Sequence, residues 1–334
     1  MNSLERYLAM LRGGVPDCVP RTPILMRFAA EYIGSNYGAF ASDYRTLVRA
    51  NAACARDFGF DQLSCTSDPY RETAGFGARI TFVRDGVPRA TQPLADSKDL
   101  ARLSRPDPLT STRMRDRIEA VRAYRSQFGD QYSILGWIEG PAAEAADLRG
   151  VMAFLVDLLK DPPFAAALLD RCVEVAVAFA RVQVDAGADT IGIGDAIASQ
   201  VSPRVYETLI QPREKRLVSA IQQFGAFVKL HICGDITHLL PGIANLGVDI
   251  LDVDHLVDLA TVRTHVGPRT ALTGNIDPAA GVLRGTPATI RQTLAAAYDQ
   301  VGNPYLVNAG CEIPSGTPPE NLRALCEPLP YRPG

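Results

Sequence analysis

The sequence lacks the features that would assign it to a membrane or to nucleic acid. Its 334 residues contain no apolar run of about 20 residues, and the first six residues do not resemble a signal peptide. The net charge is only −3, and no basic run with interleaved aromatic residues is present. We therefore expect a cytoplasmic protein that binds neither a membrane nor nucleic acid.

A disulfide framework is also not expected. The chain has seven cysteines, an odd number, and they are scattered along the sequence. This distribution favours a reducing compartment in which thiols stay free. We interpret Cys54, Cys172 and Cys326 as helix-packing residues, because free cysteine often fills space in a core.

Eight short apolar runs alternate with longer segments of helical pattern, in a chain that is 47% hydrophobic. The runs are Pro23–Phe28, Gln62–Thr66, Ser133–Ile138, Thr190–Gly194, Phe227–Ile232, Ile250–Val253, Ala271–Thr273 and Tyr305–Asn308. Near-continuous apolar runs are typical of parallel strands that are buried on both faces. Between them, Ser202–Pro203 and Thr286–Pro287 mark helix starts, since each places proline directly after an N-cap residue.

This alternation predicts an α/β fold, a (β/α)8 TIM barrel formed as one domain over residues 1–334. An open doubly wound sheet is the alternative. One segment, Arg79–Thr91, departs from the alternation, because two strand-like runs flank Asp85–Gly86. We interpret it as a small β-hairpin insertion after the second strand, placed over the mouth of the barrel.

The ends of two predicted strands suggest a metal site. His231 and Cys233 end the fifth strand and, being two residues apart, face the same side. Cys311 follows the eighth strand, where Gly310 lets the backbone turn. Catalytic groups of such barrels gather at the carboxyl ends of the strands. One imidazole and two thiolates suit zinc, and three protein ligands leave a fourth position open, as in catalytic zinc sites.

Other polar groups at predicted strand ends are weaker candidates. They are Asp195, Asp252, Asp254, His255, Asn275, Asp277 and Glu312, together with Trp137 and Glu139 at the end of the third strand. The first seven would orient substrate, hold His231 from behind or supply a fourth zinc ligand, and the alternative for them is a loop or cap residue. Trp137 and Glu139 would line the pocket, and the alternative for Trp137 is a core residue. We expect catalytic roles for Asp195 and Glu312. The expected substrate contacts are Trp137, Asp254, His255 and Asn275.

Several segments resemble the uroporphyrinogen decarboxylase superfamily. They are His231–Asp235, Leu272–Pro278, Gly310–Pro314 and Thr317–Asn321. More closely, they resemble its zinc-dependent branch, the methylcobamide:coenzyme M methyltransferases and related corrinoid-linked enzymes, and the similarity extends over nearly the whole chain. The resemblance implies a (β/α)8 barrel with zinc ligands in a His-x-Cys motif and at a late cysteine. Those positions correspond to His231, Cys233 and Cys311.

Two departures separate this chain from the decarboxylases that it resembles. In those enzymes an arginine-rich segment near the first strand binds the substrate's carboxylates. Here Arg27 is kept, but Glu31 stands where a second arginine is expected and would repel an acidic porphyrinogen. The decarboxylases also have a histidine where this chain has Cys311. Asp68 does match the decarboxylase aspartate, and we count it with Arg27 and Glu31 as a substrate-binding candidate.

The resemblance thus implies a zinc-dependent methyltransferase. Zinc would hold a thiol as its thiolate, or polarise a methoxy oxygen. The corrinoid, methylcobalamin, would be a co-substrate on a separate carrier protein, since no Asp-x-His-x-x-Gly cobalamin-binding motif is present. Coenzyme M, a folate, an aryl methyl ether and a methylated amine are all open as the small methyl donor or acceptor. A decarboxylase with another substrate and a non-catalytic zinc-storage protein are the alternatives.

Overall fold

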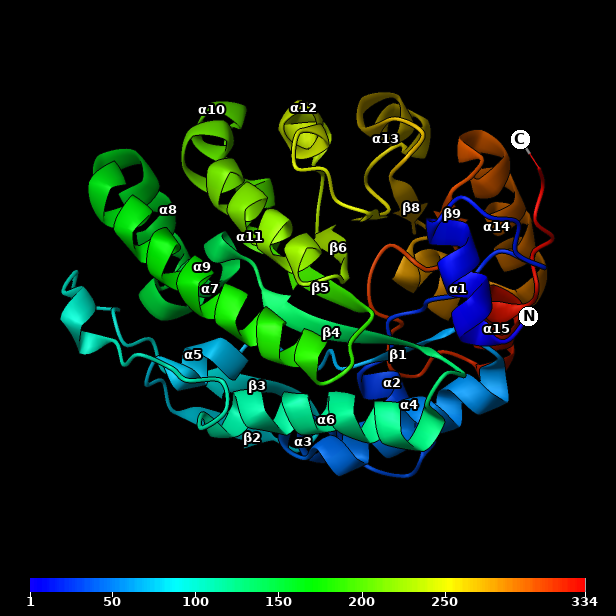
Figure 1. The fold of residues 1–334 in the computed structure, drawn as a ribbon, viewed down its shortest axis with the longest axis horizontal. Coiled ribbons are helices and arrows are strands. Elements are labelled where there is room, and N and C mark those ends of the chain that lie inside the picture. Colours follow the sequence, from blue (N-terminus) through cyan, green and yellow to red (C-terminus); the bar gives the residue numbers. More distant parts are fainter. Residues whose placement is uncertain (334) are drawn as a thin grey trace.

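Seven strands form one curled parallel sheet in the computed structural model, which describes residues 1–333 (Figure 1). In their order across the sheet they are β1 (Gln62–Ser64), β4 (Ser133–Glu139), β5 (Thr190–Gly194), β6 (Phe227–Ile232), β7 (Ile250–Val253), β8 (Ala271–Thr273) and β9 (Tyr305–Leu306). Every neighbouring pair is parallel. These seven correspond to seven of the eight predicted strands, and the fold is the barrel type that the sequence predicts.

Helices cover the outside of this sheet (Figure 1). They are α1 (Ser3–Leu11), α2 (Arg27–Tyr32), α3 (Tyr37–Ser42), α4 (Tyr44–Phe58), α5 (Arg71–Gly75), α6 (Thr112–Phe128), α7 (Pro141–Arg149), α8 (Val151–Lys160), α9 (Pro162–Asp185), α10 (Pro203–Val205), α11 (Gln211–Gln223), α12 (Leu240–Ala244), α13 (Leu259–Val266), α14 (Pro287–Val301) and α15 (Pro319–Cys326). The predicted helix starts are confirmed, because the side chains of Ser202 and Thr286 accept hydrogen bonds from the first turns of α10 and α14. Over the described residues, every helix is too short or too polar to cross a membrane.

The expectation of a first strand at Pro23–Phe28 is wrong. The chain does run between β9 and β1, where Val307 N donates to Pro20 O at 2.7 Å and Asp61 N donates to Arg21 O at 2.7 Å. These bonds link both edges of the sheet. The segment stays irregular because its prolines have no N–H to donate to a ladder, and the chain then enters α2.

The predicted hairpin after the second strand is confirmed as β2 (Ile80–Val83) paired antiparallel with β3 (Gly86–Ala90). It packs against α3, where Gly38 N donates to Arg84 O at 2.7 Å. A Cβ at Gly38 would lie 2.8 Å from Val83 O, so only glycine permits this approach. The hairpin therefore lies beside α3 and α6 in Figure 1.

The hydrophobic core lies inside the sheet and between the sheet and its helices. All seven residues of β4 are buried, and so are five of the six residues of β6. Cys54, Cys172 and Cys326 are buried in α4, α9 and α15, as predicted. Because the interior is filled by these side chains, the polar groups that can meet a ligand are those at the carboxyl ends of the strands.

Candidate metal centre and its pocket

The structure brings His231, Cys233 and Cys311 together, and we call these three residues the ligand trio. His231 lies in β6, Cys233 directly follows that strand, and Cys311 lies in the loop after β9. His231 Nε2 is 3.0 Å from Cys233 Sγ and 3.8 Å from Cys311 Sγ, and the two sulfur atoms are 3.9 Å apart. Among the described residues, this is the group of three His, Cys, Asp or Glu side chains whose ligand atoms converge closely enough for a metal.

The donor set and its spacing fit zinc. Bonds of about 2.3 Å to sulfur and about 2.0 Å to nitrogen place tetrahedral ligand atoms roughly 3.5–3.8 Å apart. Two of the three observed separations agree with this spacing, and the Nε2 to Cys233 Sγ distance of 3.0 Å is shorter. The trio leaves one tetrahedral position for a further ligand.

Buried polar groups hold the imidazole in place from behind. His231 Nδ1 is buried and lies 3.3 Å from Asp252 Oδ2, just outside hydrogen-bond geometry. Asp252 is fully buried and pairs with Lys229 Nζ at 2.9 Å, while Asn308 Nδ2 donates to it at 3.2 Å. Burial alone would raise the pKa of Asp252, but the charges of Lys229 and His231 lower it below its usual value. An anionic carboxylate behind a histidine fixes the ring and its tautomer in metal sites.

The contact between the two thiols shifts their pKa values in opposite directions. The hydrogen bond from Cys233, opposed by burial, lowers the pKa of Cys311 to about 4. The same bond raises the pKa of Cys233 well above its usual value. Burial tends to lower the pKa of His231, yet its contacts with Asp252 and Cys311 raise it to about 10. The trio thus holds protons that Zn²⁺ would displace on binding.

Two loops are shaped so that the thiols meet. A Cβ at Gly310 would lie 2.5 Å from His255 N, so glycine is required directly before Cys311. Asp254 Oδ2 accepts from Gly234 N at 2.8 Å, which fixes the turn after Cys233. Asn275 Nδ2 donates to Asp254 O at 3.2 Å. Asp254 and Asn275, predicted as substrate contacts, therefore position the backbone around the trio.

A cavity of about 220 Å³ adjoins the trio. It is lined by Ile24, Met26, Thr66, Asp68, Pro69, Trp137, Glu139, Gly194, Ala196, Glu312 and the trio itself. Trp137 lies against β5, since a Cβ at Gly192 would fall 2.2 Å from the indole ring. Of the predicted candidates outside the trio, the structure places Asp68, Trp137, Glu139 and Glu312 at this cavity.

The other predicted residues lie elsewhere. Asp195 is fully buried, and its carboxylate accepts from Ala143 N at 2.6 Å at the start of α7, so it faces away from the cavity. Arg27 and Glu31 form a partly exposed ion pair of 2.8 Å on α2. His255 is exposed and lies 2.9 Å from Asp254 Oδ1. None of these four lines the cavity among the described residues.

Glu312 and Glu139 are the two carboxyl groups that face the cavity with incomplete hydrogen bonding. Glu312 Oε1 accepts from Arg27 N at 2.9 Å. Burial raises the pKa of Glu312 to about 7, against the lowering effect of that bond. Glu139 Oε1 accepts from Arg71 Nη2 at 2.8 Å and from Trp137 Nε1 at 3.1 Å. Burial raises the pKa of Glu139 well above its usual value, although Arg71 opposes this.

Sequence reasoning missed the arginines behind these acids. Arg71 is fully buried in α5, and Arg113 in α6 donates to both oxygens of Asp68, at 2.7 and 2.9 Å. Both arginines lie within helices, away from any strand end. The signal that could have found them is charge balance, since buried carboxylates at a barrel mouth need cationic partners.

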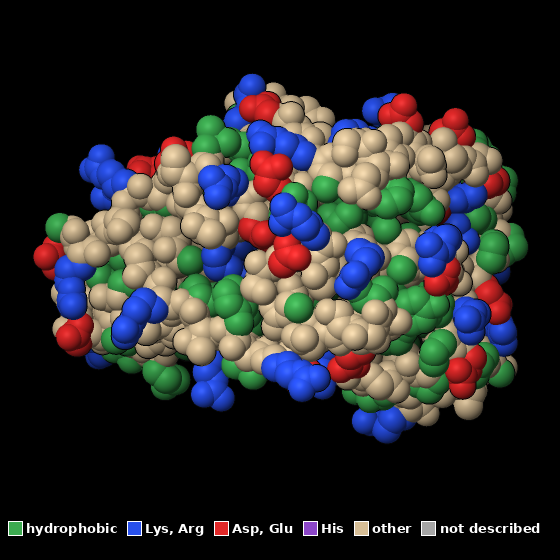
Figure 2. Space-filling view, turned by 90° about the horizontal axis from the view of Figure 1, so that it is seen from below, with side chains coloured by type: hydrophobic (Ala, Val, Ile, Leu, Met, Phe, Trp, Pro, Cys, Tyr) green, Lys and Arg blue, Asp and Glu red, His purple; other side chains and the backbone are tan. Residues whose placement is uncertain are grey.

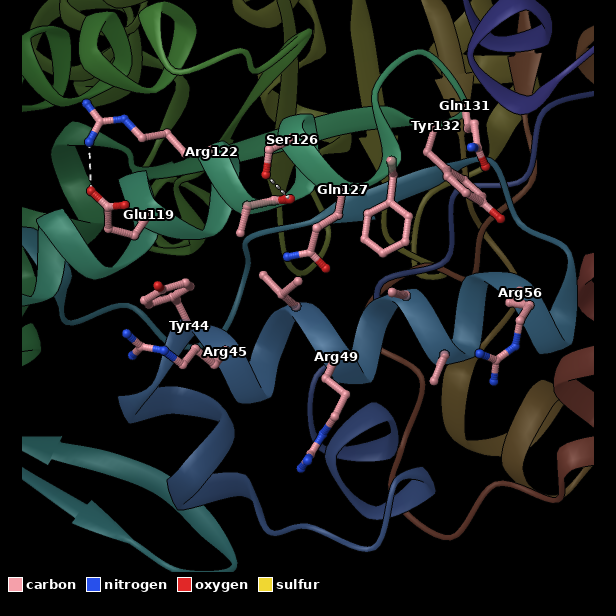
Figure 3. A pocket seen from close by; sticks show the side chains of 15 residues that line it. Tyr44, Arg45, Arg49, Arg56, Glu119, Arg122, Ser126, Gln127, Gln131 and Tyr132 are labelled. Atoms are coloured by element: carbon pink, nitrogen blue, oxygen red, sulfur yellow. Dashed lines mark hydrogen bonds and ion pairs between the residues drawn. The ribbon is translucent and has the colours of Figure 1, made fainter.

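A larger groove of about 830 Å³ lies on the outside of the barrel, between α4 and α6 (Figure 3). Arg45, Arg49 and Arg56 project from α4, and Arg122 and Glu119 from α6. The face seen in Figure 2 has basic side chains dispersed among acidic and apolar ones. The beta-hairpin contributes no described residue to this groove or to the cavity at the trio.

Comparison with known proteins gives a consistent family. The family model described as uroporphyrinogen decarboxylase (URO-D) matches residues 2–329. A methylcobamide:CoM methyltransferase of Methanosarcina barkeri is 33% identical over 96% of this chain and 95% of its own length. A uroporphyrinogen decarboxylase of Microcystis aeruginosa is 26% identical over 95% of both chains. The solved structure of a methyltransferase from Methanosarcina mazei, 26% identical, covers 97% of both chains with a TM-score of 0.89. The relatives are therefore enzymes of two activities, methyl transfer and decarboxylation.

Proposed function

This chain belongs to the uroporphyrinogen decarboxylase family, and we propose that it is a zinc-dependent methyltransferase that moves a methyl group between a corrinoid on a partner protein and a small thiol, folate or methoxylated substrate. The observation that supports this most directly is the ligand trio, in which one imidazole and two thiol groups converge beside a cavity. The relatives named as methylcobamide:CoM methyltransferases support the same class of reaction.

His231, Cys233 and Cys311 would hold the zinc ion. When bound, the ion would hold a substrate thiol in its deprotonated, nucleophilic form, or polarise a methoxy oxygen. Cys233 and Cys311 would give up their remaining protons to solvent as the metal binds. Asp252 would keep the imidazole of His231 in the tautomer that presents Nε2 to the metal.

The size of the cavity supports a corrinoid that is presented by a partner. At about 220 Å³ it is smaller than the sites of drug-sized ligands, which span roughly 300–1,000 Å³. It has room for a small methyl donor or acceptor, whereas a corrinoid macrocycle would have to approach from outside the mouth. We propose that a corrinoid carrier protein docks at this end of the barrel.

We propose that Glu312 contacts the small substrate and holds or moves a proton there. It is directly next to Cys311 and lines the cavity, and among the described residues only its Oε1 accepts a hydrogen bond, from Arg27 N, so Oε2 is available to a substrate proton. Trp137 and Asp68 would shape the cavity wall. Asp195 has no proposed catalytic role here, because its carboxylate is bound to the start of α7.

The test is methylcobalamin demethylation with coenzyme M or another thiol as acceptor, followed by the change in corrinoid absorption. The reverse assay uses cob(I)alamin with a methoxylated aromatic. We expect turnover that chelation or Cys233→Ala abolishes, whereas Cys54→Ala, a matched change at a cysteine buried in α4, keeps it. Turnover that persists in zinc-free protein would contradict the proposed mechanism.

A decarboxylase is the second candidate, because relatives of that activity match nearly the full chain. The residues at the mouth of this barrel do not suit an acidic porphyrinogen. Asp68, Glu139 and Glu312 line the cavity, and Arg27 is already paired with Glu31. Incubation with uroporphyrinogen should give no coproporphyrinogen at an enzymatic rate. Its formation by metal-free protein would favour the decarboxylase. A zinc-storage role predicts instead a metal with four protein ligands and no response to added thiols.

A further inference from the structure

The cavity beside the ligand trio has a wall that is mostly apolar. Among the described residues that line it there is no lysine or arginine, and the apolar ones come from separate segments of the chain. These apolar residues are Ile24, Met26, Pro69, Trp137 and Ala196. Met26, Pro69 and Ala196 keep part of their surface accessible, so a ligand that enters the cavity meets apolar side chains.

Trp137 forms one side of this wall. In β4 it pairs in register with Gly192 of β5, and Gly194 lies two residues further on the same face of β5. A Cβ at Gly192 would lie 2.2 Å from the indole ring, and a Cβ at Gly194 would lie 2.9 Å from it. The indole can lie across β5 only because both positions are glycine, and there it gives the cavity a flat aromatic surface.

Two of the acids in the wall are already paired. Arg113 donates to both oxygens of Asp68, at 2.7 and 2.9 Å. Arg71 Nη2 and Trp137 Nε1 both donate to Glu139 Oε1. Burial also raises the pKa of Glu139 well above its usual value, which favours its neutral form. These acids therefore offer little net charge to a ligand.

Two other polar side chains line the cavity. Thr66 Oγ1 accepts from Ser64 Oγ at 2.8 Å. Glu312 keeps Oε2 without a partner among the described residues, and it is next to Cys311, at the trio end of the cavity. A charged group on the part of a ligand that points away from the trio would therefore lose its hydration and gain no free counter-ion. An uncharged apolar group gains from burial at the same place.

We propose that the small methyl donor or acceptor has an uncharged, apolar body, which packs against Trp137 and Met26 while its sulfur or oxygen atom lies at the trio. This inference rests on the proposed function and specifies its substrate class. An apolar cavity of about 150 Å³ holds benzene, so the cavity of about 220 Å³ has room for a ring or a branched chain of similar size. A sulfonate, a folate with its carboxylates or an ammonium compound does not match this wall.

The experiment measures binding without turnover, through the fluorescence of Trp137, the single tryptophan of the chain. Zinc-loaded protein is titrated with two pairs of thiols that share a two-carbon spacer and differ in charge. In the first pair, 3,3-dimethylbutane-1-thiol has the shape of 2-mercaptoethanesulfonate. In the second pair, propane-1-thiol has the shape of 2-aminoethanethiol. Affinities are compared per thiolate, because the S–H groups of these thiols differ in pKa. We expect each neutral thiol to bind at least about ten-fold more tightly than its charged counterpart.

Variants test the apolar wall. Met26→Gln keeps the length of the side chain and adds a polar amide, so it should reduce the preference for the neutral thiols to about three-fold or less. Met26→Leu keeps an apolar side chain and should retain the preference. Met152→Gln, the same change at an exposed position of α8, should leave the preference unchanged. Because Met26 is only partly buried, its variants should fold, and circular dichroism checks this.

Three results would overturn the inference. The first is a charged thiol, in either pair, that binds as tightly as its neutral counterpart or more tightly. The second is an unchanged preference in Met26→Gln. Both leave the proposed methyl transfer standing, since thiols would still enter the cavity. The third is the absence of a fluorescence response to every thiol of the two pairs. The methylcobalamin assay then decides separately on the proposed function, since turnover with a thiol would retain it.

Discussion

Two concave regions of the molecule differ in chemistry, and the smaller of the two adjoins the reactive side chains. The groove between α4 and α6 measures about 830 Å³, while the cavity at the ligand trio measures about 220 Å³. Arg122 and Glu119 in the groove are exposed and pair with each other at 2.7 Å. Behind the cavity, Asp252 and Lys229 are buried and pair with each other next to His231. The candidate site is therefore identified by buried side chains whose possible ligand atoms converge. The volume of a cavity does not identify it.

The largest expected difference between the two regions is in metal binding. Cys233→Ala and Cys311→Ala should each reduce zinc from about one ion per chain to less than about a tenth, because a catalytic site with three protein ligands cannot lose one and keep its affinity. The fold should remain, since a core of this size does not depend on a metal. Metal analysis and circular dichroism measure the two effects. Wild-type zinc content in both variants would show that the trio is not the site.

A smaller loss of zinc binding is expected when Asp252, the carboxylate behind the imidazole of His231, is replaced. Asp252→Asn should weaken zinc binding by about 10- to 100-fold, because His231 loses its anionic partner. Competition with a chromophoric chelator measures the affinity. Asp249→Asn is the matched control, since Asp249 accepts from Val228 N at the opposite end of β6. Equal affinities in the two variants would contradict the role given to Asp252.

The ion pairs of the two regions should also differ in how much they contribute to the free energy of unfolding. Asp68→Asn breaks a buried pair and should lower the free energy of unfolding by about 3 kcal/mol, whereas Glu119→Gln in the groove should change it by less than about 1 kcal/mol. Urea unfolding measures both. Similar losses of unfolding free energy in the two variants would contradict the expectation that the buried ion pair of Asp68 stabilises the fold more than the exposed one.

The pH dependence of the Asp68 effect follows from its pKa. Burial would raise this pKa, but Arg113 holds it well below its usual range. A carboxyl group with a lowered folded-state pKa adds stability that is present above its unfolded pKa of about 3.9 and is lost as the pH falls toward the folded value. The difference between wild type and Asp68→Asn should therefore shrink below about pH 4.

The smallest effect is expected at the centre of the groove. Arg49→Ala should change neither zinc content nor methyl transfer, and it should change stability by no more than about 0.5 kcal/mol. Arg49 projects from α4 with no ion pair among the described residues. The metal and activity assays used for the cysteine variants serve here too. A marked loss of activity would identify the groove as a second functional surface.

Local pattern was sufficient for most of the fold. Seven apolar runs were recognisable as buried strands because both of their faces are covered by apolar neighbours. The hairpin at β2 and β3 followed from its Asp85–Gly86 turn. The prediction of a strand at Pro23–Phe28 was wrong. The apolar pattern shows which residues are apolar, but it does not show that proline lacks the N–H group that a strand needs. Convergence of the ligand trio could be predicted because parallel strands in a barrel end at one mouth.

Tertiary structure decided which polar side chains face the cavity. Asp195 and Glu312 look alike in the sequence, since both follow a predicted strand. One is bound to the amides of α7, and the other lines the cavity beside Cys311. The partners of Asp68 and Glu139 lie 45 and 68 residues away in sequence. The sequence by itself predicted the strand order and the three side chains that converge at the candidate metal site, because these depend on residue type and local spacing. The direction of each carboxylate depends on long-range packing and charge pairing, which no local pattern records.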